Sequence, residues 1–225
     1  MAMTTDGAVD GRSSRWAEHR TQRRAELVDA TVRAIRAHGP RVGMDEIAAM
    51  AGTSKTVVYR HFTDRAGLYA AVVERVESLI ARDVRAAVGD PLIAVEGDGR
   101  PVVAAAVDAY LRLVERDPDV YRFVVAAPLL DRDPQAVEAG GVPTHLARQI
   151  GDLVASALRA GGRPVDVAPV WGAAVVGMVR AAADDWIRPD GATHGRTREE
   201  LRDDLAALAW SGLAAVWPTR PRASR

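Results

Sequence analysis

The sequence contains no cysteine, so disulfides, zinc–thiolate sites and cysteine nucleophiles are excluded. Aromatic residues make up only 5% of its 225 residues, and a single lysine stands among 30 basic side chains. The longest apolar run, Val170 to Val179, has ten residues, whereas a transmembrane helix needs about 20. No basic stretch followed by an apolar segment opens the chain, so we expect no signal peptide, no membrane association and a cytoplasmic location.

What remains is the composition of an ordinary globular protein, with 48% hydrophobic and 27% charged residues, which is enough to bury a core. The formal net charge is zero, but the charges are not spread evenly. The stretch from Arg12 to Arg65 holds eleven basic and six acidic side chains. This excess suggests a polyanionic partner for the first quarter of the chain, although a solvated charged helix face would show the same excess.

Apolar residues recur at three- and four-residue spacings, and no segment alternates as a strand does. The pattern predicts an all-α protein with about nine or ten helices. Glycine and proline mark many of the helix ends, as at Gly39-Pro40. The predicted helices cover residues 16–38, 44–51, 54–62, 64–88, 102–115, 120–130, 143–160, 165–187 and 198–216.

Residues 44–62 meet the requirements of a helix-turn-helix. Ala48 supplies a small residue where two helices cross, and Gly52 tolerates the left-handed backbone of the turn. Val58 and Phe62 are expected to face back onto the first helix. The other face of the second helix then carries side chains that form hydrogen bonds, as a helix in a DNA major groove does: Ser54, Lys55, Thr56, Tyr59 and Arg60.

This segment resembles the TetR (tetracycline-repressor-like) family of bacterial transcriptional regulators. The likeness covers about fifty residues, from the first helix to the start of the fourth, and its most specific part is Y-R-H-F at 59–62, followed by Arg65 and Leu68. The remainder matches only in length, helicity and layout. The resemblance implies a recognition helix with Ser54, Lys55, Thr56 and Tyr59, and phosphate contacts from Tyr59, His61 and Arg65.

Three positions depart from the family pattern. Gly43 stands where the family usually has a threonine that opens the second helix, so one cap and one phosphate-binding hydroxyl are missing. Arg65 replaces the usual lysine, which keeps the charge but changes the geometry. Thr53 stands where the turn commonly carries an apolar residue. The resulting domain prediction is a disordered arm over residues 1–15, a helix-turn-helix DNA-binding domain over 16–66, a helical ligand-binding and dimerisation domain over 67–217, and a flexible tail over 218–225.

The last two predicted helices are apolar on more than one side, whereas a surface helix needs only one apolar stripe. Small residues on these second faces allow close helix approach. In the manner of the family, the two helices would pair with their copies in a two-fold four-helix bundle, although the buried core of a monomer would show the same pattern. The expected homodimer contacts are Ala173, Gly177, Ala181, Leu205, Leu208 and Gly212.

The C-terminal half also predicts an apolar cavity between helices. Arg148 and Arg180 lie near it in the sequence, which suits a small lipophilic effector with an anionic head, such as a fatty acyl compound. About half of the candidate residues are expected to line the cavity and the rest to be ordinary core. These candidates are Tyr110, Phe123, Leu146, Gln149, Ile150, Leu153, Trp171, Val175 and Met178.

The leading interpretation is a ligand-responsive DNA-binding regulator, most simply a repressor that a lipophilic effector releases from a double-stranded operator. The alternative is a helical small-molecule carrier or enzyme with an incidental helix-turn-helix. The sequence has no G-x-S-x-G, no P-loop, no G-x-G-x-x-G and no H-E-x-x-H. We therefore expect no catalytic residues, no metal and no cofactor.

Overall fold

The computed structural model of the chain describes residues 11–89, 99–126 and 142–213. These residues form nine α-helices and no strand, so the all-α prediction is confirmed. The helices are α1 (Gly11–His38), α2 (Met44–Met50), α3 (Lys55–Phe62), α4 (Arg65–Val88), α6 (Arg100–Arg116), α7 (Pro118–Ala126), α9 (Val142–Ala160), α10 (Ala168–Trp186) and α11 (Arg198–Leu213).

Two helix starts differ from the prediction by more than two residues. The helix α1 begins at Gly11 instead of Trp16, so residues 11–15 are helical. Arginine favours a helix and no proline interrupts the segment, so the helix extends toward the N-terminus beyond its apolar stripe. The helix α10 begins at Ala168 instead of Val165, because Pro169 suits only the first turn of a helix. The predicted segments 1–10, 127–130 and 214–225 lie outside the described residues.

The helix ends follow from local chemistry. Gly39 ends α1 and Gly52 forms the turn after α2, with φ values of +85° and +61° that only glycine adopts without strain. The Ser54 hydroxyl accepts a hydrogen bond from the backbone N–H of Val57, and the Asp64 carboxylate accepts one from Gly67 at 2.7 Å. These two N-caps fix the starts of α3 and α4.

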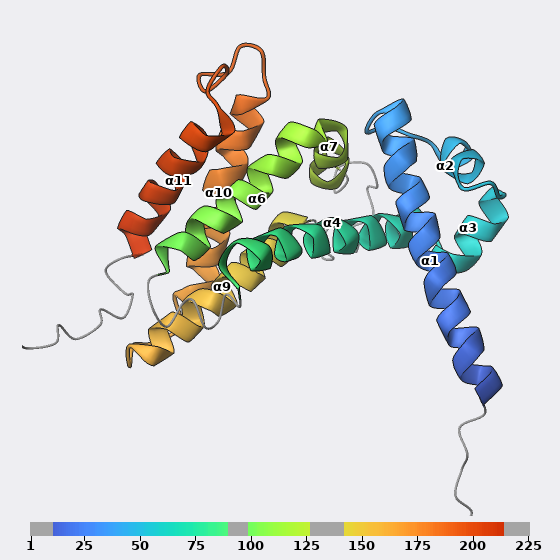
Figure 1. Ribbon diagram of the computed structural model, residues 1–225, viewed down its shortest axis with the longest axis horizontal. Coiled ribbons are helices and arrows are strands. Elements are labelled where there is room, and N and C mark those ends of the chain that lie inside the picture. Colours follow the sequence, from blue (N-terminus) through green and yellow to red (C-terminus); the bar gives the residue numbers. More distant parts are fainter. Residues whose placement is uncertain (1–10, 90–98, 127–141, 214–225) are drawn as a thin grey trace, which may run out of the picture.

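Helices α1, α2 and α3 form a bundle at one end of the molecule, and α6, α9, α10 and α11 pack together at the other (Figure 1). The long helix α4 runs between the two groups and belongs to both, because it packs on α1 and α3 as well as on α6 and α9. It crosses the predicted domain boundary between residues 66 and 67 without a break. That boundary stays a prediction.

Helices α9 and α10 cross at two glycines. A Cβ atom on Gly172 would lie 2.2 Å from the carbonyl oxygen of Ala147 and 2.6 Å from the backbone nitrogen of Gly151. Only glycine fits this position, because the atoms in the way belong to the backbone of α9. The contact sets the spacing of two helices that line the cavity described below.

Candidate nucleic-acid interface and apolar cavity

The α2–turn–α3 unit is held by a small apolar core. Val58 and Phe62 of α3 are buried, and they face Ile47 and Ala48 of α2, which are buried as well. This arrangement fixes the rotation of α3 about its own axis. The face opposite Val58 must therefore point to solvent.

The predicted base-reading side chains lie together on that outward face. Ser54 at the N-cap of α3 is exposed, as are Lys55, Thr56, Tyr59 and Arg60 on the helix itself. The ammonium of Lys55 lies 2.7 Å from the carboxylate of Asp45 on α2, and hydrogen bonding to Asp45 raises the pKa of Lys55. The sole lysine is thus ionised and held at the front of α3.

A cluster of cationic side chains surrounds the C-terminal end of α3. The guanidinium of Arg24 on α1 donates a hydrogen bond to the carbonyl oxygen of His61 at 2.8 Å and lies 4.4 Å from the centre of the Phe62 ring. Burial, followed by the charges of Arg60, Arg23 and Arg24, lowers the pKa of His61. Positive charge is therefore concentrated beside the predicted phosphate contact His61.

The start of α4 completes this surface. Arg65, the other predicted phosphate contact, is half-buried at the first position of α4, next to the cap at Asp64. At the start of α2, Gly43 makes no side-chain cap hydrogen bond, as its lack of a hydroxyl predicts. The sequence did not single out Arg23 and Arg24 of α1 as site residues. Their only signal was the excess of basic side chains over residues 12–65.

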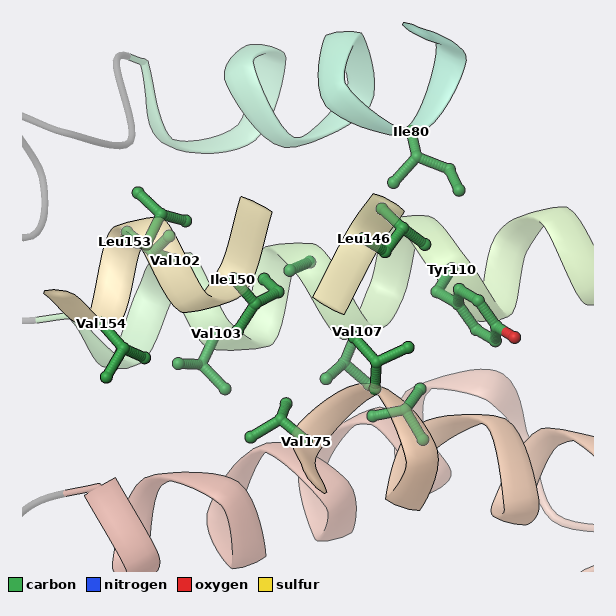
Figure 2. A pocket seen from close by; sticks show the side chains of 13 residues that line it. Ile80, Val102, Val103, Val107, Tyr110, Leu146, Ile150, Leu153, Val154 and Val175 are labelled. Atoms are coloured by element: carbon green, nitrogen blue, oxygen red, sulfur yellow. The ribbon is translucent and has the colours of Figure 1, made fainter. Parts of the chain in front are cut away.

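An apolar cavity of about 80 Å³ lies between α4, α6, α9 and α10 (Figure 2). Its wall is aliphatic except for the ring of Tyr110, which closes one end (Figure 2). A wider cavity of about 540 Å³ shares Ile80, Val102, Ala106 and three further residues with it. The rim of this outer part is polar, with the side chains of Arg85, Gln149, Asp152 and Ser156. An amphipathic compound therefore fits the combined space better than a wholly apolar or wholly polar one.

Six of the nine residues predicted for the cavity line it. The inner part is lined by Tyr110, Leu146, Ile150, Leu153 and Val175, and Gln149 lines the outer part. The pattern that could have revealed the missing wall is the apolar stripe of α6. Four of the inner lining residues that were not predicted belong to this stripe, and the others come from α4, α9 and α10. They are Ile80, Val102, Val103, Ala106, Val107, Val154, Val176 and Val179.

Phe123, Trp171 and Met178 line neither part of the cavity and belong to the portion of the candidates that was expected to be ordinary core. Phe123 lies on α7 and packs on Tyr69 of α4, with ring centroids 5.8 Å apart. Trp171 packs at the side of the smaller core cluster between α9 and α10, and Met178 packs on the main core. The stripe chosen on α10 is rotated from the face that meets the cavity.

The two arginines expected near an anionic head also lie elsewhere. Arg148 is exposed on α9, and Arg180 pairs with Asp184 at 3.7 Å. The arginine that does reach the cavity is Arg85 on the outer rim. Its position near the C-terminal end of α4 could not be read from the sequence, because the rim is assembled from separate helices.

Helix α7 connects the cavity to the α1–α3 bundle. The ring of Tyr110 packs edge-on against Tyr121 of α7, and the Tyr121 hydroxyl donates to Asp184 at 2.6 Å. Burial, as the largest cause, raises the pKa of Tyr110 to about 12. The guanidinium of Arg36 on α1 forms two hydrogen bonds, of 2.6 and 2.9 Å, with Asp117, which caps the end of α6 and directly precedes α7. Packed contacts therefore lead from Tyr110 in the cavity wall through α7 to α1.

The outer face of α10 is apolar and uncovered in the single chain, whereas the exposed residues of α11 are acidic over its first two turns and small or apolar from Ala207 onward. Val170 of α10 is 67% exposed and Leu208 of α11 is 61% exposed. Of the predicted dimer contacts, Ala173, Gly177, Ala181, Leu208 and Gly212 lie on these exposed faces. Leu205 does not: it is 7% exposed and packs inside the chain, because it faces α6.

Within the described residues, no group of three or more histidine and acidic side chains is arranged to hold a metal ion. Among the described helices, none combines the length and the apolar character needed to cross a membrane.

Comparison with known proteins agrees with this geometry. A model described as "Bacterial regulatory proteins, tetR family" matches residues 27–72, and one described as "Tetracyclin repressor-like, C-terminal domain" matches residues 84–223. An uncharacterized HTH-type transcriptional regulator of Mycobacterium tuberculosis is 32% identical over 209 residues, which are 92% of this chain and 84% of that protein. The HTH-type transcriptional activator FasR of Mycolicibacterium smegmatis is 29% identical over 203 residues, 89% of this chain and 87% of that protein. The structure of AibR in complex with isovaleryl coenzyme A and operator DNA has the same fold, with a TM-score of 0.52 at 20% identity over 83% of this chain and 97% of that chain.

Proposed function

The chain belongs to the TetR family of bacterial transcriptional regulators, and on that premise we propose that it is a repressor that a small lipophilic effector releases from a double-stranded DNA operator. The observation that carries the proposal is the course of α4. This helix begins at Arg65 beside the cationic cluster, and fifteen residues later its Ile80 lines the cavity. Occupation of the cavity therefore acts on the helix that supports α3. Because the proposed partner is operator DNA, the location we propose for the protein is the cytoplasm.

The effector we propose is a fatty acyl compound with an anionic head. Its acyl chain would fill the aliphatic inner cavity up to Tyr110, and its head would lie at the outer rim near Arg85. Arg85 is exposed and supplies the positive charge on this rim, which also carries the carboxylate of Asp152. The complex of AibR with isovaleryl coenzyme A supports the choice of acyl class.

The mechanism is a shift between two conformations. An effector changes DNA affinity only by as much as it binds one conformation better than the other. A chain that presses on Tyr110 displaces Tyr121 and α7, which Arg36 and Asp117 join to α1. Movement of α1 and α4 together re-orients α3.

The active form we propose is a homodimer built on the exposed faces of α10 and α11. A Cβ atom on Gly177 or Gly212 would meet nothing within 4 Å in the single chain, so a partner helix has room to approach closely. Exposed apolar side chains beside these glycines supply the area to bury. A dimer presents two copies of α3 to half-sites about 34–36 Å apart.

The experiment that tests the function is a DNA-binding titration with and without effector. Labelled duplex from the region upstream of the protein's own gene is titrated in fluorescence anisotropy, with acyl-coenzyme A compounds of increasing chain length. We expect a loss of affinity of about 1–3 kcal/mol, or roughly 5- to 150-fold, on saturation with the best ligand. Since FasR is an activator, in vitro transcription on the same promoter decides between repression and activation. Binding of an acyl compound without any change in DNA affinity would favour the carrier or enzyme interpretation.

Filling the cavity should uncouple the protein from its effector. Ala106 lines both the inner and the outer cavity, so Ala106→Phe places a ring in the space that the acyl chain needs. We expect DNA affinity to be retained and the effector response to be lost, in the same anisotropy titration. The matched control is Ala86→Phe on the exposed side of α4, which should respond as the wild type does. A full response in Ala106→Phe would place the effector site elsewhere.

Removal of the lysine should relax base recognition. Lys55 projects from the exposed front of α3, so Lys55→Ala should cost about 1–3 kcal/mol at one base pair of each half-site. Selection of binding sites from a randomised duplex library measures the change in preference. Lys55→Arg keeps the charge and should preserve the salt dependence while altering the preferred base. An unchanged motif in Lys55→Ala would remove Lys55 from the base-reading set.

A further inference from the structure

The N-terminal half of α1 extends beyond the bundle that the rest of the helix helps to form (Figure 1). Its first buried residue is Leu27, and the described side chains before it are exposed or half-exposed. Helices of this kind that pack on nothing are only marginally stable in water. The exposed Trp16, at 69%, lies on this segment.

One face of this segment continues the packing face of α1. Trp16, Arg20, Arg23 and Arg24 precede the buried Leu27 and Thr31 at three- and four-residue spacings, so all of them lie on one side of the helix. The acidic side chains are on other sides. Glu18 precedes Gln22 by four residues and Glu26 follows it by four, and Gln22 donates a hydrogen bond to Glu26. The segment is therefore basic toward the bundle and acidic away from it.

This face is continuous with the end of α3. Arg24 binds the carbonyl oxygen of His61, and the charges of Arg23 and Arg24 contribute to the environment of the His61 ring. Because a carbonyl oxygen carries no net charge, this hydrogen bond does not neutralise the positive charge of Arg24. The ion pair of Arg23 with Glu26 is exposed, and such pairs are worth little, so an external anion exchanges with it readily.

We propose that Trp16, Arg20, Arg23 and Arg24 form a second DNA-binding surface, which binds the sugar–phosphate backbone of duplex DNA flanking the bases that α3 reads. The inference rests on the proposed operator binding. The arginines bind phosphates, and the indole of Trp16 packs on the deoxyribose edge between them. Such contacts fix the position and orientation of the protein without reading sequence.

The first test measures the salt dependence of DNA binding. Each phosphate contact adds about 0.9 to the slope of log affinity against log salt concentration. In the proposed dimer the double variant Arg20→Ala/Arg23→Ala removes four such contacts, so it should lower that slope by about 3.6 and weaken operator and random duplex by the same factor. Hydroxyl-radical footprinting should show lost protection at the outer edges of the footprint only. The matched control is Arg33→Ala, because Arg33 is exposed on the opposite side of the same helix.

The second test uses Trp16 as its own reporter. The other four tryptophans lie between residues 171 and 217, so Trp16 is the single indole in the first 170 residues. Addition of duplex DNA should quench or shift the tryptophan emission of the wild type, and Trp16→Phe should abolish most of that change. A change that persists in Trp16→Phe would contradict contact of this face with DNA.

The outcomes separate this inference from the proposed function. Wild-type protein that binds no duplex in a salt-dependent way overturns both. Wild-type binding with an unchanged slope and footprint in Arg20→Ala/Arg23→Ala overturns the second surface alone. If the double variant unfolds, Arg20→Gln replaces it, since Arg20 is exposed, and the expected drop in slope for the dimer is then about two.

Discussion

Gly177→Arg should yield a monomer that binds its operator roughly 100- to 10,000-fold more weakly than the wild type. In the single chain the substitution is harmless, because the space around Gly177 is open. In the proposed dimer it places one unpaired charge on each side of a two-fold axis, in an apolar contact, which is costly. The loss of affinity follows because a monomer occupies one half-site and forfeits the gain from joining two binding units.

Light scattering after size-exclusion chromatography measures the assembly, and anisotropy on operator duplex measures the affinity. Gly177→Ala is the control, since it keeps a small residue at the close approach and should remain dimeric. A Gly177→Arg protein that is still a stable dimer would mean that the exposed faces of α10 and α11 are not the interface.

Gly172→Ala should lower the free energy of unfolding by about 3 kcal/mol, at the upper end of what overpacking a core usually costs. The new methyl group would lie 2.2 Å from the oxygen of Ala147 and 2.9 Å from the Cα atom of Gly151. Because these are backbone atoms of α9, no side-chain rotation relieves the overlap, and α9 and α10 must move apart. The gain of about 1 kcal/mol in helix propensity from glycine to alanine offsets only part of this cost.

Urea denaturation followed by circular dichroism measures the effect. Gly161→Ala is the control at the end of α9, because its added Cβ atom would meet other atoms at 3.6 Å, an ordinary contact distance. Equal stabilities of the Gly172→Ala and wild-type proteins would show that the helices adjust at no cost. We also expect the displaced wall to weaken effector binding, since α9 and α10 both line the cavity.

The helix-turn-helix was predictable because its determinants are local. Gly52 in the turn, Ser54 at the cap and Val58 in the small core are within a few residues of one another, and their roles follow from backbone conformation and spacing. The same holds for most helix ends. Interactions between residues that are close in the sequence therefore account for nearly all of the predicted secondary structure.

The cavity was predicted only in part because its wall is assembled from four helices whose rotations depend on one another. On α10 the sequence favoured Trp171 and Met178, but the crossing at Gly172 turns Val176 and Val179 to the cavity instead. Contacts between distant residues are equally hard to foresee. The pair of Arg36 and Asp117 spans 81 positions, and nothing in the sequence near either residue indicates the other.

The uninterrupted course of α4 has a mechanical consequence. Ile80 and Arg65 are fifteen residues apart on one rigid rod, a distance of about 22 Å at about 1.5 Å per residue. If the rod pivots near the cavity, a tilt of about 5° moves its far end by about 2 Å over that length. In the proposed dimer both α4 helices tilt, so the distance between the two copies of α3 changes by up to about twice that amount. The repeat of duplex DNA stays at about 34–36 Å. If the proposed effector binds, a small angular adjustment to it would thus be amplified into a mismatch of length at the DNA.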